Sequence, residues 1–318
     1  MGLKIIGTGR KLPERIVSND ELTAFLDTSD SQIIAKTGVK TRAICTSESL
    51  SDLAGEAGRL ALAKSGLTAA DMDLIICATM TADYIIPALA CVVQKKLGAK
   101  CPAFDVSAAC TGFIYALDIA HSYLDSGKAK NILIISADMM SRRIDWSDKS
   151  TCILFGDGAG ACVVTQGEAL KYIKLSADGN IEPLYIQAGS GNSPFAENRS
   201  EQGYLTMQGQ NVFKFAVKSI EDEVRQALAA LNLSEEDVGY YLLHQANNRI
   251  IESARIRLGV QAEKFPVNIE RWGNMSAASI PVLLDEMLEG AKIKTGDTLV
   301  CVGFGAGMTV GTCILVWQ

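Results

Sequence analysis

The stretches ALAKSGLTAADMDLIICA (residues 61–78) and ALAALNLSEEDVGYYLLH (residues 227–244) share one pattern and lie 166 residues apart. Each contains an alanine-rich segment with helical periodicity, then Leu with Ser or Thr, an aspartate, and a short apolar run typical of a strand. A pattern that returns at a fixed interval indicates an internal duplication. We therefore predict two related halves, at residues 1–166 and 167–318.

Two further pairs of segments recur at the same interval. The apolar run NILIISADM (131–139) corresponds to DTLVCVGFG (297–305), and the segment beginning SAACTGF (107–113) corresponds to GNMSAAS (273–279). Each pair alone is a common α/β pattern. Three recurrences at a single interval support the duplication more strongly than any one of them does.

The strand-like segments indicate the fold class. Residues 74–78 and 132–136 are apolar on both faces, as strands covered by helices on both sides must be. Residues 299–317 carry no charge and have the length of a membrane span, but their glycines and β-branched residues predict two buried strands joined by a glycine loop. Residues 170–199 contain Gly189-Ser190-Gly191 and other turn signals, and we expect an excursion between the halves. The prediction is an α/β protein with two parallel-type βα halves packed back to back.

Composition narrows the function classes. The chain has 318 residues, of which 48% are hydrophobic and 21% charged, so it can bury a large core. The net charge of -6 disfavours nucleic-acid and membrane-surface partners, because phosphate binding needs a basic face. Nine cysteines without a C-x-x-C pair predict neither a disulfide framework nor a zinc site. The N-terminus has no signal-peptide pattern, and we expect a cytoplasmic protein.

Cys110 differs from the other cysteines, most of which fit small core residues. It follows the predicted strand 103–106 and begins a helix with an apolar face. A thiolate at a helix N-terminus is stabilised by the helix dipole and by free backbone N–H groups. Small neighbours at 107–109 leave room for a substrate. Cys110 is therefore a candidate nucleophile.

The sequence contains only two histidines. His121 lies eleven residues beyond Cys110 on the same predicted helix, roughly 16 Å away, and cannot touch the thiol. His244 ends the strand that begins at Tyr240 and is followed by polar residues, and strand ends are where α/β proteins place ligands. A lone histidine at a strand end is more often a core residue, so His244 needs further support.

The duplication supplies that support. At the interval of 166 residues Cys110 corresponds to Ser276, so the loop at 272–275 is the counterpart of the turn that carries the cysteine. We expect both turns and the end of the His244 strand to meet in one cleft. Asn274 in this loop either bonds its own backbone or donates hydrogen bonds to a ligand.

Three glycine-rich segments are candidates for ligand-binding loops. Gly7-Thr8-Gly9 is followed by Leu12 where a dinucleotide fingerprint needs its third glycine, which excludes that motif. Residues 156–160 lack the Lys-Ser/Thr ending of a phosphate loop, and we interpret them as a tight structural turn. Residues 303–307 either form a turn between strands or aim backbone N–H groups at a carbonyl oxygen.

Five motifs together resemble those of the 3-oxoacyl-ACP synthase III family: DVSAACTGFIYAL (105–117), ILFGDGAGA (153–161), LLHQANNRI (242–250), WGNMSAASIP (272–281) and GFGAGMTVG (303–311). The resemblance covers residues 1–318 with almost no insertion. It implies a homodimeric thiolase fold with a five-layered αβαβα core, in agreement with the duplication.

The resemblance implies an acyltransferase that performs a decarboxylative Claisen condensation at the start of fatty acid biosynthesis. Cys110 would take the acyl group of an acyl-CoA, while His244 and Asn274 would stabilise the enolate formed from malonyl-ACP. Backbone N–H groups of Cys110 and of the Gly305-Ala306 turn would form the oxyanion hole, although relatives usually have Gly at the position of Ala306. No cofactor and no metal are implied.

The resemblance also implies contacts with an acidic carrier protein, with CoA and with the acyl chain. The carrier protein is expected at Gln245, Ala246, Asn247, Asn248 and Arg249, and at Lys214 and Lys218. The two lysines lie one helical turn apart and fit a solvated basic face equally well. CoA and pantetheine contacts are expected at Thr28, Gln32, Lys36, Lys149, Gly209, Phe213 and Asn247. The acyl pocket is expected at Ile86 and Phe304.

Departures from the family concern the CoA site. Relatives often have Trp at the position of Gln32 and Arg at those of Lys36 and Lys149, and Gln and Lys stack poorly on adenine. The alternatives are a substitute ring from Trp146, a weakly held nucleotide, or a donor that is a carrier protein or another thioester. Ile86, where many relatives have Phe, indicates an altered chain-length preference.

Three other functions are alternatives to this condensing enzyme. A specialised relative from polyketide or quinolone-type biosynthesis would keep Cys110 and could keep His244 and Asn274. A Cys-His-Asn hydrolase would use the same side chains, but the C-G-S/A-C-W/Y signature of papain-like proteases is absent. A non-enzymatic scaffold would have no use for this combination of residues.

Overall fold

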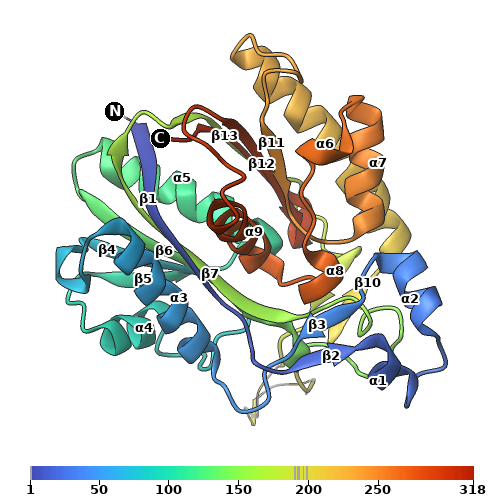
Figure 1. The fold of residues 1–318 in the computed structure, drawn as a ribbon. Helices are drawn as coiled ribbons and strands as arrows, with labels where there is room; N and C mark the ends of the chain where they lie inside the picture. Colours follow the sequence, from blue (N-terminus) through green and yellow to red (C-terminus); the bar gives the residue numbers. More distant parts are fainter. Residues whose placement is uncertain (1, 190, 192–193, 196, 198–199) are drawn as a thin grey trace.

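Five layers in the order αβαβα make up the computed structural model, which describes residues 2–189, 191, 194–195, 197 and 200–318 (Figure 1). Two helices lie between the two sheets, and pairs of helices cover the outer faces. The central pair consists of α5 (Gly112–Asp125) and α9 (Ser279–Glu289). The outer pairs are α3 (Leu50–Ser65) with α4 (Leu89–Leu97), and α6 (Gly209–Ala230) with α7 (Asn248–Leu258). This arrangement confirms the predicted layers.

The two sheets repeat one strand order, which confirms the internal duplication. The first sheet runs β1 (Gly2–Lys11), β7 (Asp157–Gly167), β6 (Asn131–Met139), β4 (Leu74–Ala78), β5 (Ala103–Val106). The second runs β8 (Leu170–Ala177), β13 (Thr309–Val316), β12 (Thr298–Gly305), β11 (Tyr240–Leu243). Among the residues that the structure describes, the second sheet has no strand in the place of β5. Only β4, β5 and β6, and likewise β11 and β12, pair in parallel, so the sheets are mixed rather than parallel.

The register of the duplication shifts by one residue within the second half. Leu74 on β4 and Tyr240 on β11 lie 166 residues apart, whereas their pairing partners Ile132 and Leu299 lie 167 apart. Two short 3-10 turns occupy matching places, at Ala109–Thr111 and Ser276–Ala278. Each begins with a left-handed residue, at φ 46° for Ala109 and φ 50° for Ser276. The counterpart of Cys110 is therefore Ala277, and the predicted pairing of Cys110 with Ser276 was wrong by one residue.

The two ends of the second half differ in how well they were predicted. The uncharged run at 299–317 forms the predicted pair of strands, β12 and β13. The segment from residue 170 was predicted as an excursion, but it begins with β8, an edge strand of the second sheet. Beyond it, β9 (Leu184–Ile186) and β10 (Leu205–Met207) pair as a small hairpin. Ser190 and Arg199 of the predicted segment lie outside the described residues.

A small unit near the N-terminus packs against the second half. It comprises β2 (Ile16–Ser18), α1 (Asn19–Thr23), α2 (Asp30–Thr37) and β3 (Thr41–Ala43). The backbone N–H of Lys40 donates to the carbonyl of Glu270 at 2.8 Å, next to α8 (Ile269–Trp272). The buried Arg42 donates to the carbonyl of Ile153 at 3.0 Å. The unit thus borders the cavity described below.

No helix in the described part of the chain combines the length and the apolar character needed to cross a bilayer.

Candidate active site

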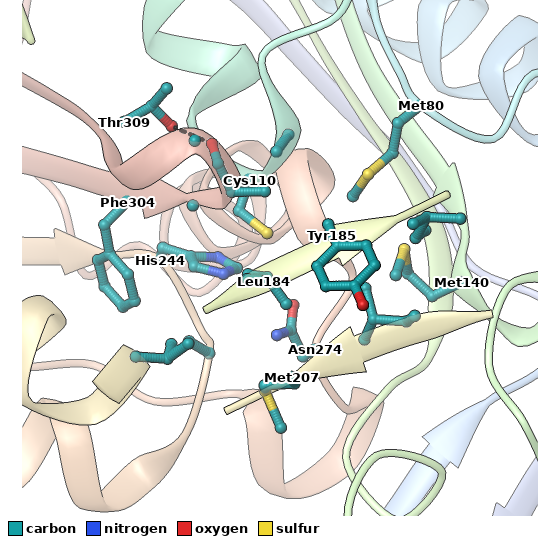
Figure 2. A pocket seen from close by; sticks show the side chains of 18 of the residues that line it. Met80, Cys110, Met140, Leu184, Tyr185, Met207, His244, Asn274, Phe304 and Thr309 are labelled. Carbon is teal, nitrogen blue, oxygen red and sulfur yellow. Dashed lines mark hydrogen bonds between the residues drawn. The ribbon is translucent and has the colours of Figure 1, made fainter. Parts of the chain in front are cut away.

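One cavity of about 510 Å³ brings together the three predicted catalytic side chains. Cys110 comes from the turn between β5 and α5, His244 from the end of β11, and Asn274 from the loop after α8. Figure 2 shows the Cys110 sulfur directed toward the space between the His244 ring and the Asn274 amide. Residues far apart in the sequence therefore share one site.

Cys110 lies against the end of strand β12. A Cβ placed on Gly305 would stand 2.9 Å from the backbone nitrogen of Cys110 and 3.2 Å from its Cβ. The first separation is shorter than real Cβ atoms show, so the close approach to the Cys110 backbone requires glycine at 305. The Ala306 backbone follows directly, and Ala306 is not among the described residues with positive φ, so its Cβ fits. The predicted oxyanion donors, Cys110, Gly305 and Ala306, all line the cavity.

Burial favours the protonated form of the Cys110 thiol. Its side chain is almost fully buried, and burial raises the pKa of the thiol to about 12. The neighbouring Ser276 side chain and the backbone N–H of Cys110 act in the opposite direction, but burial dominates. The helix start alone does not produce a thiolate here, contrary to the simplest form of the prediction.

His244 continues the strand ladder and is held by an aromatic contact. Its backbone N–H donates to the carbonyl of Val302 at 2.9 Å, and its ring meets the edge of Phe304 at 5.2 Å between centroids. Burial lowers the pKa of His244 to about 3, so the imidazole is neutral. Its Nδ1 is buried with no hydrogen-bond partner among the described residues. We assign the ring proton to Nε2, because a buried N–H without an acceptor is the costlier arrangement.

Asn274 is oriented by its own loop. Its backbone N–H donates to the carbonyl of Leu154 at 2.9 Å, and its carbonyl accepts from Gly156 at 3.0 Å. The side-chain Oδ1 accepts from the backbone N–H of Ser276 at 2.8 Å. The Nδ2 amino group therefore remains as the donor toward the cavity. Both interpretations of Asn274 therefore hold. Its Oδ1 bonds the backbone of its own loop, and its Nδ2 can donate to a ligand.

The chemical capacity of the site follows from these orientations. His244 Nε2–H and Asn274 Nδ2–H are two neutral donors beside a buried thiol, in a cavity with mostly apolar walls. Neutral donors in such surroundings bind an oxygen that gains negative charge during a reaction without needing a counter-ion. The arrangement suits the stabilisation of an enolate or a tetrahedral oxyanion.

Sequence reasoning missed a polar pair behind the thiol. Asp138 is buried, and its Oδ1 accepts from Met80 N–H at 2.9 Å and from Thr81 Oγ1 at 2.9 Å. Burial raises the pKa of this carboxyl group. Its Oδ2 and the Ser276 Oγ have no partner of normal geometry within the described residues. The continuous apolar run of β6 gave no signal that Asp138 would approach the nucleophile.

One end of the cavity holds the residues predicted to contact pantetheine. Gly209, Phe213 and Asn247 all line it. Asn247 starts helix α7, and its Nδ2 donates to the carbonyl of Lys36 at 3.1 Å. These contacts place the residues together at one rim, as the resemblance implied.

The residues expected at the carrier protein divide into exposed and buried ones. Arg249 is exposed and lies 5.8 Å over the ring of Phe213 at the rim, and Asn248 and Lys214 are also exposed. Lys218 is exposed but forms an ion pair with Asp222.

The prediction for Gln245 was wrong. This side chain is fully buried, with Nε2 donating to Leu243 and Oε1 accepting from Asn268 at 3.0 Å, and it braces the loop instead of facing a partner. Ala246 is buried as well, and it contributes to the cavity wall rather than to an outer surface.

The outer residues expected to hold CoA do not line the cavity. Thr28, Gln32, Lys36 and Lys149 lie outside its walls, and Lys149 donates to the carbonyl of Asp27 at 3.0 Å. The Thr28 hydroxyl donates to Gln32 Oε1 at 3.2 Å.

Trp146, the suggested substitute for the indole that relatives stack on adenine, does not line the cavity. It is half-buried against the core, and its Nε1 donates to the carbonyl of Ser141 at 3.1 Å. The alternative in which Trp146 supplies the ring stays a prediction.

The acyl-pocket predictions have opposite outcomes. Phe304 lines the cavity beside His244, as expected. Ile86 does not line the cavity of its own chain, because it is 84% exposed in a loop with the exposed Tyr84 and Ile85, and its role in the acyl pocket stays a prediction. Much of the remaining wall is built from residues that the sequence did not single out: Met80, Met140, Arg143, Leu154, Leu184, Tyr185, Ile186, Leu205 and Met207.

Comparisons with known proteins agree with this geometry. The family model "3-Oxoacyl-[acyl-carrier-protein (ACP)] synthase III" matches residues 104–179, and its C-terminal counterpart matches residues 228–317. A beta-ketoacyl-[acyl-carrier-protein] synthase III of Clostridium perfringens (strain SM101 / Type A) is 45% identical over 318 residues, with 98% of each chain covered. This chain belongs to the 3-oxoacyl-ACP synthase III family. The assignment confirms the predicted thiolase fold and an acyltransferase-type condensing enzyme.

Solved structures of the family superpose along the whole chain. The 3-oxoacyl-[acyl-carrier-protein] synthase III of Aquifex aeolicus VF5 is 43% identical, covers 99% of this chain and 100% of its own, and gives a TM-score of 0.92. The priming beta-ketosynthase of the R1128 polyketide pathway is 32% identical, covers 100% and 97%, and gives 0.93. The hydrolase and scaffold alternatives receive no support from these comparisons.

Proposed function

We propose that this chain condenses an acyl group carried on Cys110 with malonyl-ACP, releasing CO2 and forming 3-oxoacyl-ACP at the start of fatty acid biosynthesis. The observation that carries the proposal is the meeting of one thiol and two neutral donors, Cys110, His244 and Asn274, in a single apolar cavity. Family membership supports the same reaction.

The first half-reaction moves the acyl group onto the enzyme. The sulfur of Cys110 attacks the thioester carbonyl of an acyl-CoA, the bond from that carbonyl to the CoA sulfur breaks, and the thiol proton ends on CoA. One thioester replaces another at nearly equal energy. Because burial holds the pKa of Cys110 at about 12, deprotonation accompanies the attack instead of preceding it. Backbone N–H groups of Cys110 and Ala306 hold the transient oxyanion.

The second half-reaction makes the carbon–carbon bond. His244 Nε2–H and Asn274 Nδ2–H donate to the thioester oxygen of malonyl-ACP, the bond to the carboxylate breaks, and CO2 leaves an enolate. The enolate carbon attacks the acyl carbonyl on Cys110, the carbon–sulfur bond breaks, and the departing thiolate takes up a proton from solvent to restore the thiol. A neutral His244 suits this role, since it donates a hydrogen bond throughout. No cofactor or metal enters these steps, and their absence remains a prediction.

An acidic carrier protein and acyl-CoA are the proposed partners. Arg249 and Lys214 are exposed cations near the pantetheine end of the cavity, and Arg249 lies over Phe213 in its wall. Positive charge at this rim complements an acidic carrier and speeds its association. The location we propose is the cytoplasm, where the nine free cysteines would stay reduced.

A homodimer is the proposed assembly. Tyr84, Ile85 and Ile86 are 58%, 101% and 84% exposed, and adjacent apolar side chains at such exposure mark an interaction surface. Ile85→Glu is expected to shift the protein from dimer to monomer in size-exclusion chromatography with light scattering. Ile256→Glu is the control, because Ile256 is 62% exposed on helix α7, away from this loop. Equal behaviour of the two variants would contradict the proposed dimer surface.

Intact-mass measurement tests the reaction directly. After incubation with a series of acyl-CoAs, the protein is expected to gain one acyl mass, and the Cys110→Ala variant none. Addition of malonyl-ACP is then expected to remove that mass and to yield 3-oxoacyl-ACP. Loss of the acyl group in buffer alone, as free acid, would sink the proposal in favour of hydrolysis.

A specialised condensation is the second candidate. The R1128 priming beta-ketosynthase supports it, because this relative has the same fold at 32% identity. Product analysis with malonyl-ACP and with malonyl-CoA separates the two candidates, since a fatty acid enzyme is expected to use the carrier-bound form.

A further inference from the structure

One formally charged side chain, Arg143, lies in the wall of the cavity among the described residues. Most of the other lining side chains are apolar, among them Met80, Met140 and Met207, and the polar ones carry no formal charge. A guanidinium keeps its charge at every pH at which proteins stay folded. The cavity therefore carries one permanent positive charge in apolar surroundings.

Two backbone hydrogen bonds hold Arg143 near one end of the cavity. Its N–H donates to the carbonyl of Met140 at 2.8 Å, and its carbonyl accepts from Leu205 N–H at 2.7 Å. Both partners are wall residues. Figure 2 shows Met140 on the opposite side of the Cys110 sulfur from Phe304. Arg143 thus belongs to the end that an acyl group on Cys110 would fill, away from the pantetheine rim.

Arg143 has no partner for its charge. The adjacent Arg142 donates to Asp83 Oδ1 at 3.0 Å, which satisfies its guanidinium. No ion pair and no side-chain hydrogen bond is formed by Arg143 with any described residue. A half-buried cation without an anion is unfavourable, and a bound anion would relieve that cost.

We propose that Arg143 selects an acyl donor whose chain ends in a carboxylate, so that Cys110 is loaded with the monothioester of a short dicarboxylic acid. This inference rests on the proposed function and adds the substrate class. A guanidinium binds a carboxylate through two parallel hydrogen bonds, which fixes direction as well as charge. The methylene groups between the carboxylate and the thioester lie along the methionine-rich wall. Tyr185, also in this wall, offers a hydroxyl beside the same end.

The carboxylate of malonyl-ACP is the other anion available to Arg143, and the chemistry disfavours it. Loss of CO2 removes that negative charge, so a guanidinium paired with it would stabilise the ground state and slow the reaction. A carboxylate at the far end of the acyl chain is untouched by the condensation. The bonds that form and break on loading are unchanged, with Cys110 sulfur replacing CoA sulfur.

The test measures loading of Cys110 by intact mass with matched donors. Succinyl-CoA, glutaryl-CoA and adipyl-CoA are compared with butyryl-CoA, pentanoyl-CoA and hexanoyl-CoA, which have equal chain lengths without the carboxylate. At least one dicarboxylic donor is expected to load at least about tenfold faster than its neutral match, a preference of about 1.4 kcal/mol. Arg143→Leu is expected to abolish that preference, and Arg143→Lys to keep part of it. Arg142→Gln is the control and is expected to keep it in full.

The possible results distinguish a failure of this inference from a failure of the proposed function. If neutral donors load as fast as dicarboxylic ones and the acyl-enzyme still condenses with malonyl-ACP, the inference falls while the proposed function stands. If Arg143→Leu leaves donor preference intact but slows the malonyl step of the loaded enzyme, Arg143 serves the other carboxylate and the inference falls. If no donor loads Cys110, both fall. Circular dichroism of each variant shows whether a loss arises from misfolding.

Discussion

Two turns in equivalent places of the two halves show how a duplicated fold divides its tasks. The turn at Ala109–Thr111 and the turn at Ser276–Ala278 both begin with a left-handed residue and both lead into a central helix. The first turn presents Cys110 to the cavity, whereas its counterpart Ala277 is buried and has no reactive group. The same backbone conformation therefore presents a nucleophile in the first half and packs within the core in the second half.

The difference originates in what precedes each turn. Strand β5 leads directly into the Cys110 turn, but the second sheet has no strand in that place. The chain there forms α8 and the loop that carries Asn274, which bonds to Leu154 and Gly156 of the first half. In place of a fifth strand, the second half thus has a segment that crosses to the first half. One half supplies the nucleophile, and the other supplies both donors.

Removing a donor of the second half tests this division most strongly. His244→Ala is expected to slow decarboxylation of malonyl-ACP by about 10³-fold, because a preorganised hydrogen bond to the forming enolate is lost. Loading of Cys110 is expected to change less than about fivefold. His121→Ala, in helix α5 outside the cavity, should leave both steps unchanged. Equal losses in loading and decarboxylation would contradict the separation of roles.

The junction of the halves should be the next most sensitive place. Gly305→Ala places a Cβ 2.9 Å from the backbone nitrogen of Cys110, which must displace either the nucleophile or the oxyanion donors. We expect loading to fall by about 10²-fold. Gly55→Ala in helix α3 is the control, since its Cβ would meet only a lysine side chain at 3.5 Å. Stopped-flow loading assays that show no loss for Gly305→Ala would refute the tight junction.

The pH dependence of stability tests whether His244 is neutral. Its pKa is lowered to about 3 by burial, so the unfolded chain binds more protons than the folded one as the pH falls from about 6.5. The neutral, buried His244 therefore contributes fully to the free energy of unfolding above pH 6.5, and this contribution is lost as the pH falls toward 3. Between pH 8 and pH 5 the native protein should lose about 2 kcal/mol more unfolding free energy than His244→Gln does. Parallel urea titration curves for the two proteins would argue against a neutral, buried ring.

The smallest expected effect concerns the face that we propose as the docking site of the carrier protein. Lys214 lies on helix α6 of the second half, and Lys214→Gln is expected to raise KM for malonyl-ACP about threefold at low salt. Lys100→Gln makes the same charge change in the first half and should have no effect. Added salt should shrink the difference between the two variants. If they respond alike, the carrier does not approach through α6.

Much of the fold and the central residues followed from sequence because they depend on local patterns. Apolar runs of strand length predicted the buried strands, and their recurrence predicted the two halves. The exclusion of His121 by helical geometry left His244 as the partner of Cys110. The one-residue shift that moves the counterpart of Cys110 to Ala277 could not be predicted, because an insertion in a loop leaves no mark on the flanking patterns.

The cavity wall was beyond sequence reasoning for a different reason. Met140 and Leu205 have the same apolar character as core residues, and only tertiary packing decides that they face a void. Gln245 looks like a surface residue next to Asn247, yet it is buried because Asn268 and Leu243 satisfy its amide. Ile86 was assigned to the pocket by resemblance, and its own chain leaves it exposed.

The cavity around Cys110 also determines the order in which the substrates bind and CoA leaves. The pantetheine rim and the methionine-rich end belong to the same cavity, so the arm of the first donor occupies the space that the arm of malonyl-ACP needs. CoA must depart before the second substrate binds, and the enzyme alternates between a free and an acylated form. Double-reciprocal plots at several fixed donor concentrations will then be parallel, and either substrate in excess will inhibit by occupying the form meant for the other.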